Sequence, residues 1–277
     1  MTGRRRILAQ GAMAVAVGLV AACAPRPTTI APLAGGARAE RYLSQLPRRE
    51  QRAAVVDGAA TIWTRAVALC DSCPPRRLPA LEAGFVLAWP DTFRLRIGSM
   101  FGTALDLGLA GDSVTAYAPA QRWGVALDAG KDSLGLEGPG RLAVRLVSGV
   151  WRPPQPAWAG GTWEDGLLVL RWRDAADSVA LAIDGSGTLV RARLWRDAQR
   201  GVAVDYERWE VADGTAWPAL VRVRTPGGAL DLSCRLERLT FPARPDRSRT
   251  TVHVPADAEW IGLDRLRGLL ERLGPPQ

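Results

Sequence analysis

The chain has 277 residues, 47% of them hydrophobic, and its 36 Lys and Arg residues outnumber 28 Asp and Glu, for a formal net charge of +8. This length fits one large domain or two small ones, and the apolar content excludes a mostly disordered chain. Because His253 is the only histidine, sites that need several histidine ligands are excluded. The positive charge is spread along the chain, so we expect no nucleic-acid partner.

Residues 1–22 have the three parts of a secretory signal peptide. Arg4–Arg6 supply the cationic start, Ile7–Val20 form an apolar stretch, and two alanines precede Cys23. The apolar stretch is shorter than the roughly 20 residues that a membrane-spanning helix needs. We therefore expect residues 1–22 to be a signal peptide that is removed, with a plain secretory peptide and a short membrane helix as the alternatives to the lipoprotein type.

The lipoprotein type is indicated by Leu19–Cys23, which resembles the lipobox of bacterial lipoproteins: an aliphatic residue and two small residues before a cysteine. The resemblance implies that Cys23 is diacylated, becomes the mature N-terminus and anchors the protein in a membrane. Many inner-membrane lipoproteins carry Asp in the place of Ala24, so this residue favours the outer membrane. Pro25–Ala37 holds three Pro and two Gly without periodicity, so residues 23–37 are interpreted as the anchor and a flexible tether.

Residues 38–277 are expected to form the folded domain. In Arg38–Val56, apolar side chains such as Tyr42 and Leu46 recur at helical spacing, although Pro47 predicts a break. After this helix the apolar residues recur at period two, which predicts half-buried strands. The first series of strands covers Thr61–Leu69, Leu81–Trp89, Thr92–Gly98, Ala104–Leu109, Ser113–Tyr117 and Trp123–Leu127. The second covers Leu167–Arg173, Ser178–Asp184, Leu189–Arg196, Val202–Val211, Ala219–Thr225 and Ala229–Phe241.

Between the two series a short helix is predicted over Arg141–Ser148, ended by Gly149. A loop rich in Pro and Gly follows, and we expect its Trp151, Trp158 and Trp163 at a pocket mouth or a membrane interface. Asp257–Leu273 has apolar residues every three or four positions and predicts a C-terminal amphipathic helix. Many strands and few helices predict a mainly β (α+β) fold with a strongly curved antiparallel sheet.

Three stretches resemble the LolA/LolB-like superfamily of periplasmic and outer-membrane lipoprotein-handling proteins. Phe93–Leu107 is similar to the family's strand, loop with an exposed apolar residue before Gly, and second strand; Leu142–Trp151 is similar to its short helix ending at Gly; Asp205–Gly228 is similar to its C-terminal meander. The resemblance covers roughly residues 38–255. It implies a half-barrel of about eleven strands whose concave face is covered by helices around an apolar cavity.

The resemblance also implies a function. The ligands would be acyl chains or lipoprotein cargo, received from a periplasmic carrier protein by a monomer at the outer membrane, without a cofactor. In the family, the loop that corresponds to Met100 and Phe101 projects an apolar residue that helps deliver cargo to the membrane. We therefore expect Met100 and Phe101 to contact the membrane, the alternative being that Phe101 folds back and plugs the end of the barrel.

The cysteines offer three interpretations. Cys70 and Cys73 have the spacing of a thioredoxin-like motif, but Pro74 follows at once and no helix is predicted there. In an oxidising periplasm a local disulfide between Cys70 and Cys73 is favoured, while Cys234, on the apolar side of a strand, is expected to be a buried thiol. A zinc site with Cys234 and His253 as the further ligands is formally possible but less favoured.

Catalytic motifs are missing from the sequence. It holds no Gly-x-Ser-x-Gly, no His-Glu-x-x-His and no Gly-rich phosphate loop, so we name no catalytic residue, no metal ligand and no cofactor, and do not expect an enzyme. The expected function is binding or transfer of lipids or lipoproteins. An assembly lipoprotein that uses the sheet to bind proteins, and an unrecognised enzyme, are the alternatives.

Overall fold

The computed structural model describes residues 33–67, 75, 77–128, 138–154, 161–174, 177–197, 200–244, 246–262 and 265. All of them belong to one compact unit that begins at Leu33. The signal peptide, Cys23, Cys70 and Cys73 lie outside the described residues, so the lipid anchor and the disulfide remain predictions.

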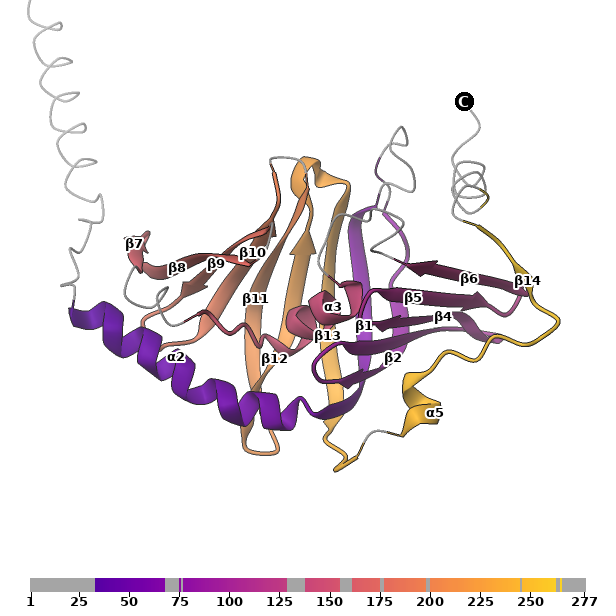
Figure 1. The fold of residues 1–277 in the computed structure, drawn as a ribbon, viewed down its shortest axis with the longest axis horizontal. Coiled ribbons are helices and arrows are strands. Elements are labelled where there is room, and N and C mark those ends of the chain that lie inside the picture. The colour runs from indigo at the N-terminus through magenta and orange to yellow at the C-terminus, as the bar shows by residue number, and fades with distance from the viewer. Residues whose placement is uncertain are drawn as a thin grey trace, which may run out of the picture. The chain divides into compact units, whose positions relative to one another are not determined.

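The described residues are mostly β-structure in one large, curved, open sheet of 14 strands (Figure 1). The strand order is β14-β6-β5-β4-β3-β2-β1-β13-β12-β11-β10-β9-β8-β7. Neighbouring strands are antiparallel except β14, which pairs with β6 in parallel. The strands of the first half are β1 (Val55–Val67), β2 (Leu81–Ala88), β3 (Thr92–Ser99), β4 (Gly102–Ala110), β5 (Ser113–Ala118) and β6 (Trp123–Asp128). Those of the second half are β7 (Thr162–Glu164), β8 (Leu167–Asp174), β9 (Asp177–Ile183), β10 (Leu189–Trp195), β11 (Gly201–Ala212), β12 (Thr215–Arg224), β13 (Leu230–Thr240) and β14 (Glu259–Trp260).

The sheet therefore has more strands than the family resemblance implies. The edge strands β7 and β14 hold three and two residues, too few for apolar alternation to be visible in the sequence. The remaining strands overlap their predicted positions, because a period of two places every second side chain on one face. The predicted starts at Thr61 and Ala219 were wrong, since β1 already begins at Val55 and β12 at Thr215.

Three α-helices are described: α2 (Leu33–Arg52), α3 (Pro139–Ser148) and α5 (Arg247–Thr250), together with the short 3-10 helix η1 (Pro226–Gly228). Helix α2 begins within the predicted tether, runs through Pro47 and ends before Val55, so the prediction of Arg38–Val56 was wrong at both ends. Val55 and Val56 instead pair with β2, as β-branched residues favour. The predicted C-terminal helix does not begin at Asp257, because residues 256–260 form a turn and β14; beyond Gly262 only Arg265 is described.

Helix α3 shows how the sheet curves. It contacts β3, β4 and β5, and also β12, although β5 and β12 are separated by six inter-strand steps, about 29 Å in a flat sheet. A helix of ten residues is only about 15 Å long, so the sheet must curl around it (Figure 1). Gly140 fixes its start, since a Cβ there would lie 2.0 Å from the backbone oxygen of Asp91. Gly149 ends it at φ 65°, as predicted.

The helix face of the sheet is the face that packs against α2 and α3, and one continuous core cluster joins these helices to it. The other is called the outer face. Between β2 and β6 the outer face is crossed by residues 246–262, the C-terminal strap, whose carbonyls at Ser248 and Arg249 accept hydrogen bonds from Arg94 at 2.9 and 3.1 Å. Arg94 also binds Asp106 through two hydrogen bonds of 2.8 and 2.6 Å, and this ion pair is buried beneath the strap.

Candidate functional site

The turn between β3 and β4 exposes two large apolar side chains. Met100 is 90% and Phe101 93% exposed, the highest values among the large hydrophobic residues that the structure describes. The turn is held from within: the Ser99 hydroxyl donates to the Gly102 carbonyl at 3.0 Å and accepts from the Phe101 amide at 3.3 Å. Gly102 sits at φ 111°, in the region that favours glycine. Phe101 therefore does not plug the barrel; membrane contact by this tip remains a prediction.

An apolar surface begins directly at this tip. Ile97 and Leu105 are cross-strand partners on the helix face. The next partners on this face form the row Phe85, Leu95, Leu107, Ala116 and Val125, which crosses β2 to β6. We name as the apolar wall six half-buried residues of the helix face: Leu95, Ile97, Leu105, Leu107 and Ala116 from this region, and Ile62 on the neighbouring β1.

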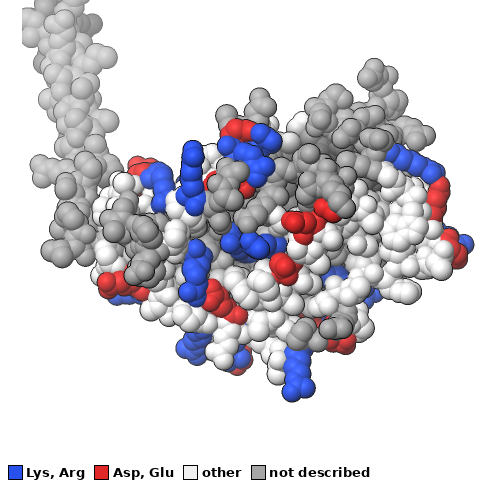
Figure 2. Space-filling model, viewed as in Figure 1, with Lys and Arg blue, Asp and Glu red and all other residues white. Residues whose placement is uncertain are grey.

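The other half of the helix face is closed. Side chains of β8 to β12 such as Leu170, Leu181 and Ile183 are completely buried, and α2 contacts β8, β9 and β12. The main sheet contacts of α2 do not include the strands of the apolar wall. Helix α3 covers only part of this wall. In the space-filling view, charges of both signs are interspersed on the visible face without a single-sign field (Figure 2).

A buried polar cluster holds α2 onto the sheet. The Tyr42 hydroxyl donates to the Trp151 carbonyl at 2.6 Å, and Trp151 Nε1 donates to the Tyr206 hydroxyl at 2.8 Å. Burial raises the pKa values of both tyrosines. Burial also lowers the pKa of Arg49, whose guanidinium donates to Gln45 at 2.6 Å and stacks on Trp209. Perturbed pKa values often mark active sites, but Tyr42, Trp151 and Tyr206 are enclosed and bond to one another, and Arg49 packs beside them with one nitrogen buried without a partner. We therefore assign the cluster a structural role.

Trp151 corrects a prediction. It was expected at a pocket mouth, yet it is 1% exposed, because its indole nitrogen and its backbone both find partners in the cluster. Trp163 is half-buried beneath the Arg38 guanidinium, and Trp158 lies outside the described residues.

The structure separates two of the residues considered for zinc. Cys234 packs against the core cluster, and burial raises the pKa of its thiol to about 12, which keeps it neutral at physiological pH. His253 is exposed in the C-terminal strap. In the described part of the chain, no three His, Cys, Asp or Glu residues are grouped as a metal site needs. Nor is any described helix both long and apolar enough to cross a membrane.

Sequence reasoning missed the arginine pattern of the outer face. Arg191 and Arg193 on β10, and Arg222 and Arg224 on β12, follow the same period of two as the apolar residues between them. The period was visible, but which residue of β11 stands between the two pairs depends on the register of the sheet.

Comparisons with known proteins found no matching family model and no matching curated protein. Among solved structures, a LolA superfamily protein from Nitrosomonas europaea is similar, with a TM-score of 0.49, 12% identity and coverage of 76% of this chain and 97% of that chain. A DUF1329 family protein from Desulfovibrio piger has a TM-score of 0.49 at 10% identity, covering 77% and 97%. A domain provisionally assigned to outer membrane lipoprotein sorting, from Vibrio parahaemolyticus, has a TM-score of 0.43 at 10% identity, covering 76% and 96%.

Proposed function

We propose that this protein is a lipid-anchored periplasmic lipoprotein of the outer membrane that binds acyl chains or lipoproteins and passes them to the membrane. One observation carries the proposal: an exposed apolar tip, Met100 and Phe101, continues directly into the apolar wall on the inside of a strongly curved sheet. Exposing such side chains to water is unfavourable, and exposed apolar surface of this kind marks a contact site. The function is binding and transfer, without chemistry on the ligand.

The geometry supports a path from membrane to wall. The tip projects from the β3–β4 turn, and Ile97 and Leu105 are the first helix-face pair below it. An acyl chain that leaves the membrane at the tip would meet Leu95 and Leu107 next along the same strands. In this proposal α2 and α3 cover the concave face, and the chain lies between α3 and the apolar wall.

Binding of a fluorescent fatty acid, dansyl-undecanoic acid, tests the proposal. The probe should bind the purified protein, and Leu107→Glu should weaken it at least tenfold, because a carboxylate would then face the acyl chain. Ala126→Glu is the matched control, since Ala126 is exposed on β6 and its strand partner Thr115 lies on the outer face. Circular dichroism must show that both variants fold. No binding by the wild type, or equal loss in both variants, contradicts the proposal.

The anchor is tested separately. Cys23→Ser should abolish metabolic labelling with palmitate and release the protein from the membrane fraction, since Cys23 is the only acylation site that we propose. Unchanged labelling and fractionation would contradict the lipoprotein assignment and leave the acyl-binding site untouched.

A further inference from the structure

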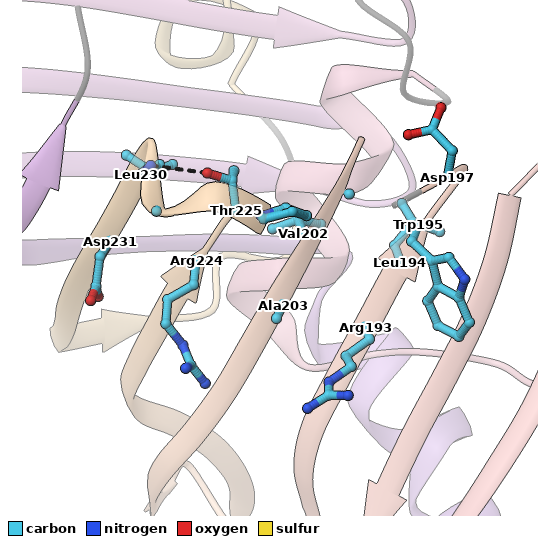
Figure 3. Close-up of a pocket in the computed structure, with 13 residues that line it drawn as sticks. Arg193, Leu194, Trp195, Asp197, Val202, Ala203, Arg224, Thr225, Leu230 and Asp231 are labelled. Carbon is cyan, nitrogen blue, oxygen red and sulfur yellow. Dashed lines mark hydrogen bonds between the residues drawn. The ribbon is translucent and has the colours of Figure 1, made fainter. Parts of the chain in front are cut away.

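The outer face of β8 to β13 carries a regular row of arginines. The strand register places six residues side by side across the sheet: Arg171, Ala180, Arg193, Ala203, Arg224 and Asp231. Arginine thus alternates with alanine on successive strands. Arg193 and Arg224 are two strands apart, about 10 Å between their backbones, and only the methyl group of Ala203 lies between them. Figure 3 shows both guanidinium groups extending in the same direction from β10 and β12.

The neighbouring row differs in one residue. There the register aligns Arg191, Asp205 and Arg222, so a carboxylate stands on β11 between two arginines. Asp205 accepts a hydrogen bond of 2.6 Å from Arg191 Nε and another from Arg224. Burial would raise the pKa of Asp205, but these hydrogen bonds and charges lower it overall. In the row that holds Arg193 and Arg224, the residue on β11 is Ala203 instead of an acid. No carboxylate therefore stands between these two arginines, and we call this position the gap.

The two arginines beside the gap are incompletely paired. Arg193 is exposed and forms no hydrogen bond or ion pair with the described residues. The carboxylate of Glu164 accepts a hydrogen bond from Arg171 at 2.7 Å, which lowers the pKa of Glu164, and the charge of Arg193 only adds to this effect. Arg224 bonds to Asp205 through one terminal nitrogen, while its Nε is buried and has no partner. The Arg224 side chain as a whole is 39% exposed, and a guanidinium carries five N–H donors, so Arg224 can bind a further acceptor beside Asp205.

The gap opens into a pocket of about 570 Å³ between the ends of β10–β11 and β12–β13. Arg193, Ala203 and Arg224 line it on one side (Figure 3). Trp195, Pro226 and Leu230 add apolar surface. The carboxylates of Asp197 and Asp231 also line the pocket, and each is paired with an arginine of its own, Arg200 and Arg222. A ligand that fits therefore has an oxyanion at one end and an apolar part at the other. This site is distinct from the apolar wall, which lies on the helix face.

We propose that this pocket binds an amphiphilic phosphate, with the phosphate above Ala203 between Arg193 and Arg224 and the apolar part against Trp195. Guanidinium groups match phosphate oxygens in geometry and bind them with charge-assisted hydrogen bonds. The phosphate takes the place that the Asp205 carboxylate occupies in the next row. Soluble alkyl phosphates and lipid headgroups share this chemistry. The inference does not depend on the proposed acyl-binding function.

Isothermal titration calorimetry on the whole protein tests the site with three soluble probes: hexyl phosphate, inorganic phosphate and hexanol. Hexyl phosphate should bind most tightly, inorganic phosphate more weakly, and hexanol not measurably. Binding of hexyl phosphate should weaken as the salt concentration rises. Vesicles of phosphatidylcholine with and without phosphatidic acid then show whether the phosphate belongs to a lipid or to a soluble molecule. Binding to the phosphatidic acid vesicles that depends on the arginines indicates a lipid headgroup. Binding of hexyl phosphate without binding to these vesicles indicates a soluble ester.

Two variants place the phosphate. Ala203→Asp inserts a carboxylate between the arginines and should reduce hexyl phosphate affinity at least tenfold while preserving or raising the melting temperature. Arg193→Gln should cause a similar loss, and it decides the matter if Ala203→Asp does not fold. Arg173→Gln, an exposed arginine of β8 outside the pocket lining, should bind as the wild type does. Failure of hexyl phosphate to bind the wild type, or full binding by the folded Ala203→Asp variant, overturns the inference. Leu107→Glu should leave this binding unchanged, so the two proposals fail separately.

Discussion

The two halves of the helix face differ in how completely the same kind of sequence is buried. In the closed half, β8 to β12, apolar residues at period two are enclosed beneath α2 and the loop at Trp151. In the open half, β3 to β6, most of the equally regular apolar residues stay half-buried, with Phe93 and Val125 as buried exceptions. Alternation in a sequence therefore shows which side chains share a face, but which part of that face becomes a core depends on where the helices dock.

The largest expected effect tests this comparison directly. Leu181→Ala in the closed half should lower the free energy of unfolding by about 2–5 kcal/mol, because Leu181 is fully buried and its loss leaves a cavity. Leu107→Ala in the open half should cost roughly 1 kcal/mol, because less surface is removed from water in the folded state. Urea denaturation of both variants measures the difference. Equal losses would mean that the two halves are packed alike.

The polar cluster of the closed half gives the next effect. Tyr206→Phe removes the acceptor of Trp151 Nε1 and leaves this donor buried without a partner. The expected loss is about 1–3 kcal/mol of unfolding free energy. Tyr117→Phe is the control, since Tyr117 lies half-buried on the outer face of β5, and it should change stability by less than about 0.5 kcal/mol. A neutral Tyr206→Phe would show that water or a rearranged side chain satisfies the indole.

The sequence predicted the strands better than the ends of the helices. Period two is local and regular, so residues such as Phe93, Leu95 and Ile97 identify β3 without knowledge of the fold. Pro47 predicts a break, yet α2 continues through it, because Tyr42, Leu46 and Arg49 on both sides of the proline are buried against the sheet. Tertiary packing outweighed a local preference that costs about 3 kcal/mol in an exposed helix.

The candidate site was predictable only where it is local. Met100 and Phe101 adjoin a glycine between two strands, so a turn follows from that sequence. The exposure of Phe101 was one of two alternatives, and the structure decides it. The pocket between Arg193 and Arg224 needs the register of three strands, and a shift of one residue would place Ala203 on the other face. Trp151 was misjudged for a related reason, since its partner Tyr206 is 55 residues away.

A smaller, pH-dependent effect concerns the outer face of the closed half. The folded-state pKa of Asp205 lies below its ordinary value, because hydrogen bonds from Arg191 and Arg224 outweigh its burial. Its ion pairs therefore stabilise the fold above the unfolded pKa of about 3.9, and this contribution is lost as the pH falls through the folded pKa. Asp205→Asn should lose less stability than the wild type between pH 7 and pH 3. Denaturation with urea across this pH range measures the effect, and an equal loss in Asp205→Asn and the wild type would contradict it.

The smallest effect on stability is expected at the tip of the open half. Phe101 is 93% exposed, so Phe101→Glu should change the unfolding free energy by less than about 0.5 kcal/mol. Liposome binding by the protein should nevertheless fall, because a carboxylate resists transfer into the interface that the phenyl ring favours. Val211→Glu is the matched control: Val211 is 77% exposed, but the strand register places its hairpin at the opposite end of the sheet. If both variants weaken liposome binding equally, the tip is not the part of the protein that contacts the membrane. If only Phe101→Glu weakens it, the open half faces the membrane through the β3–β4 turn.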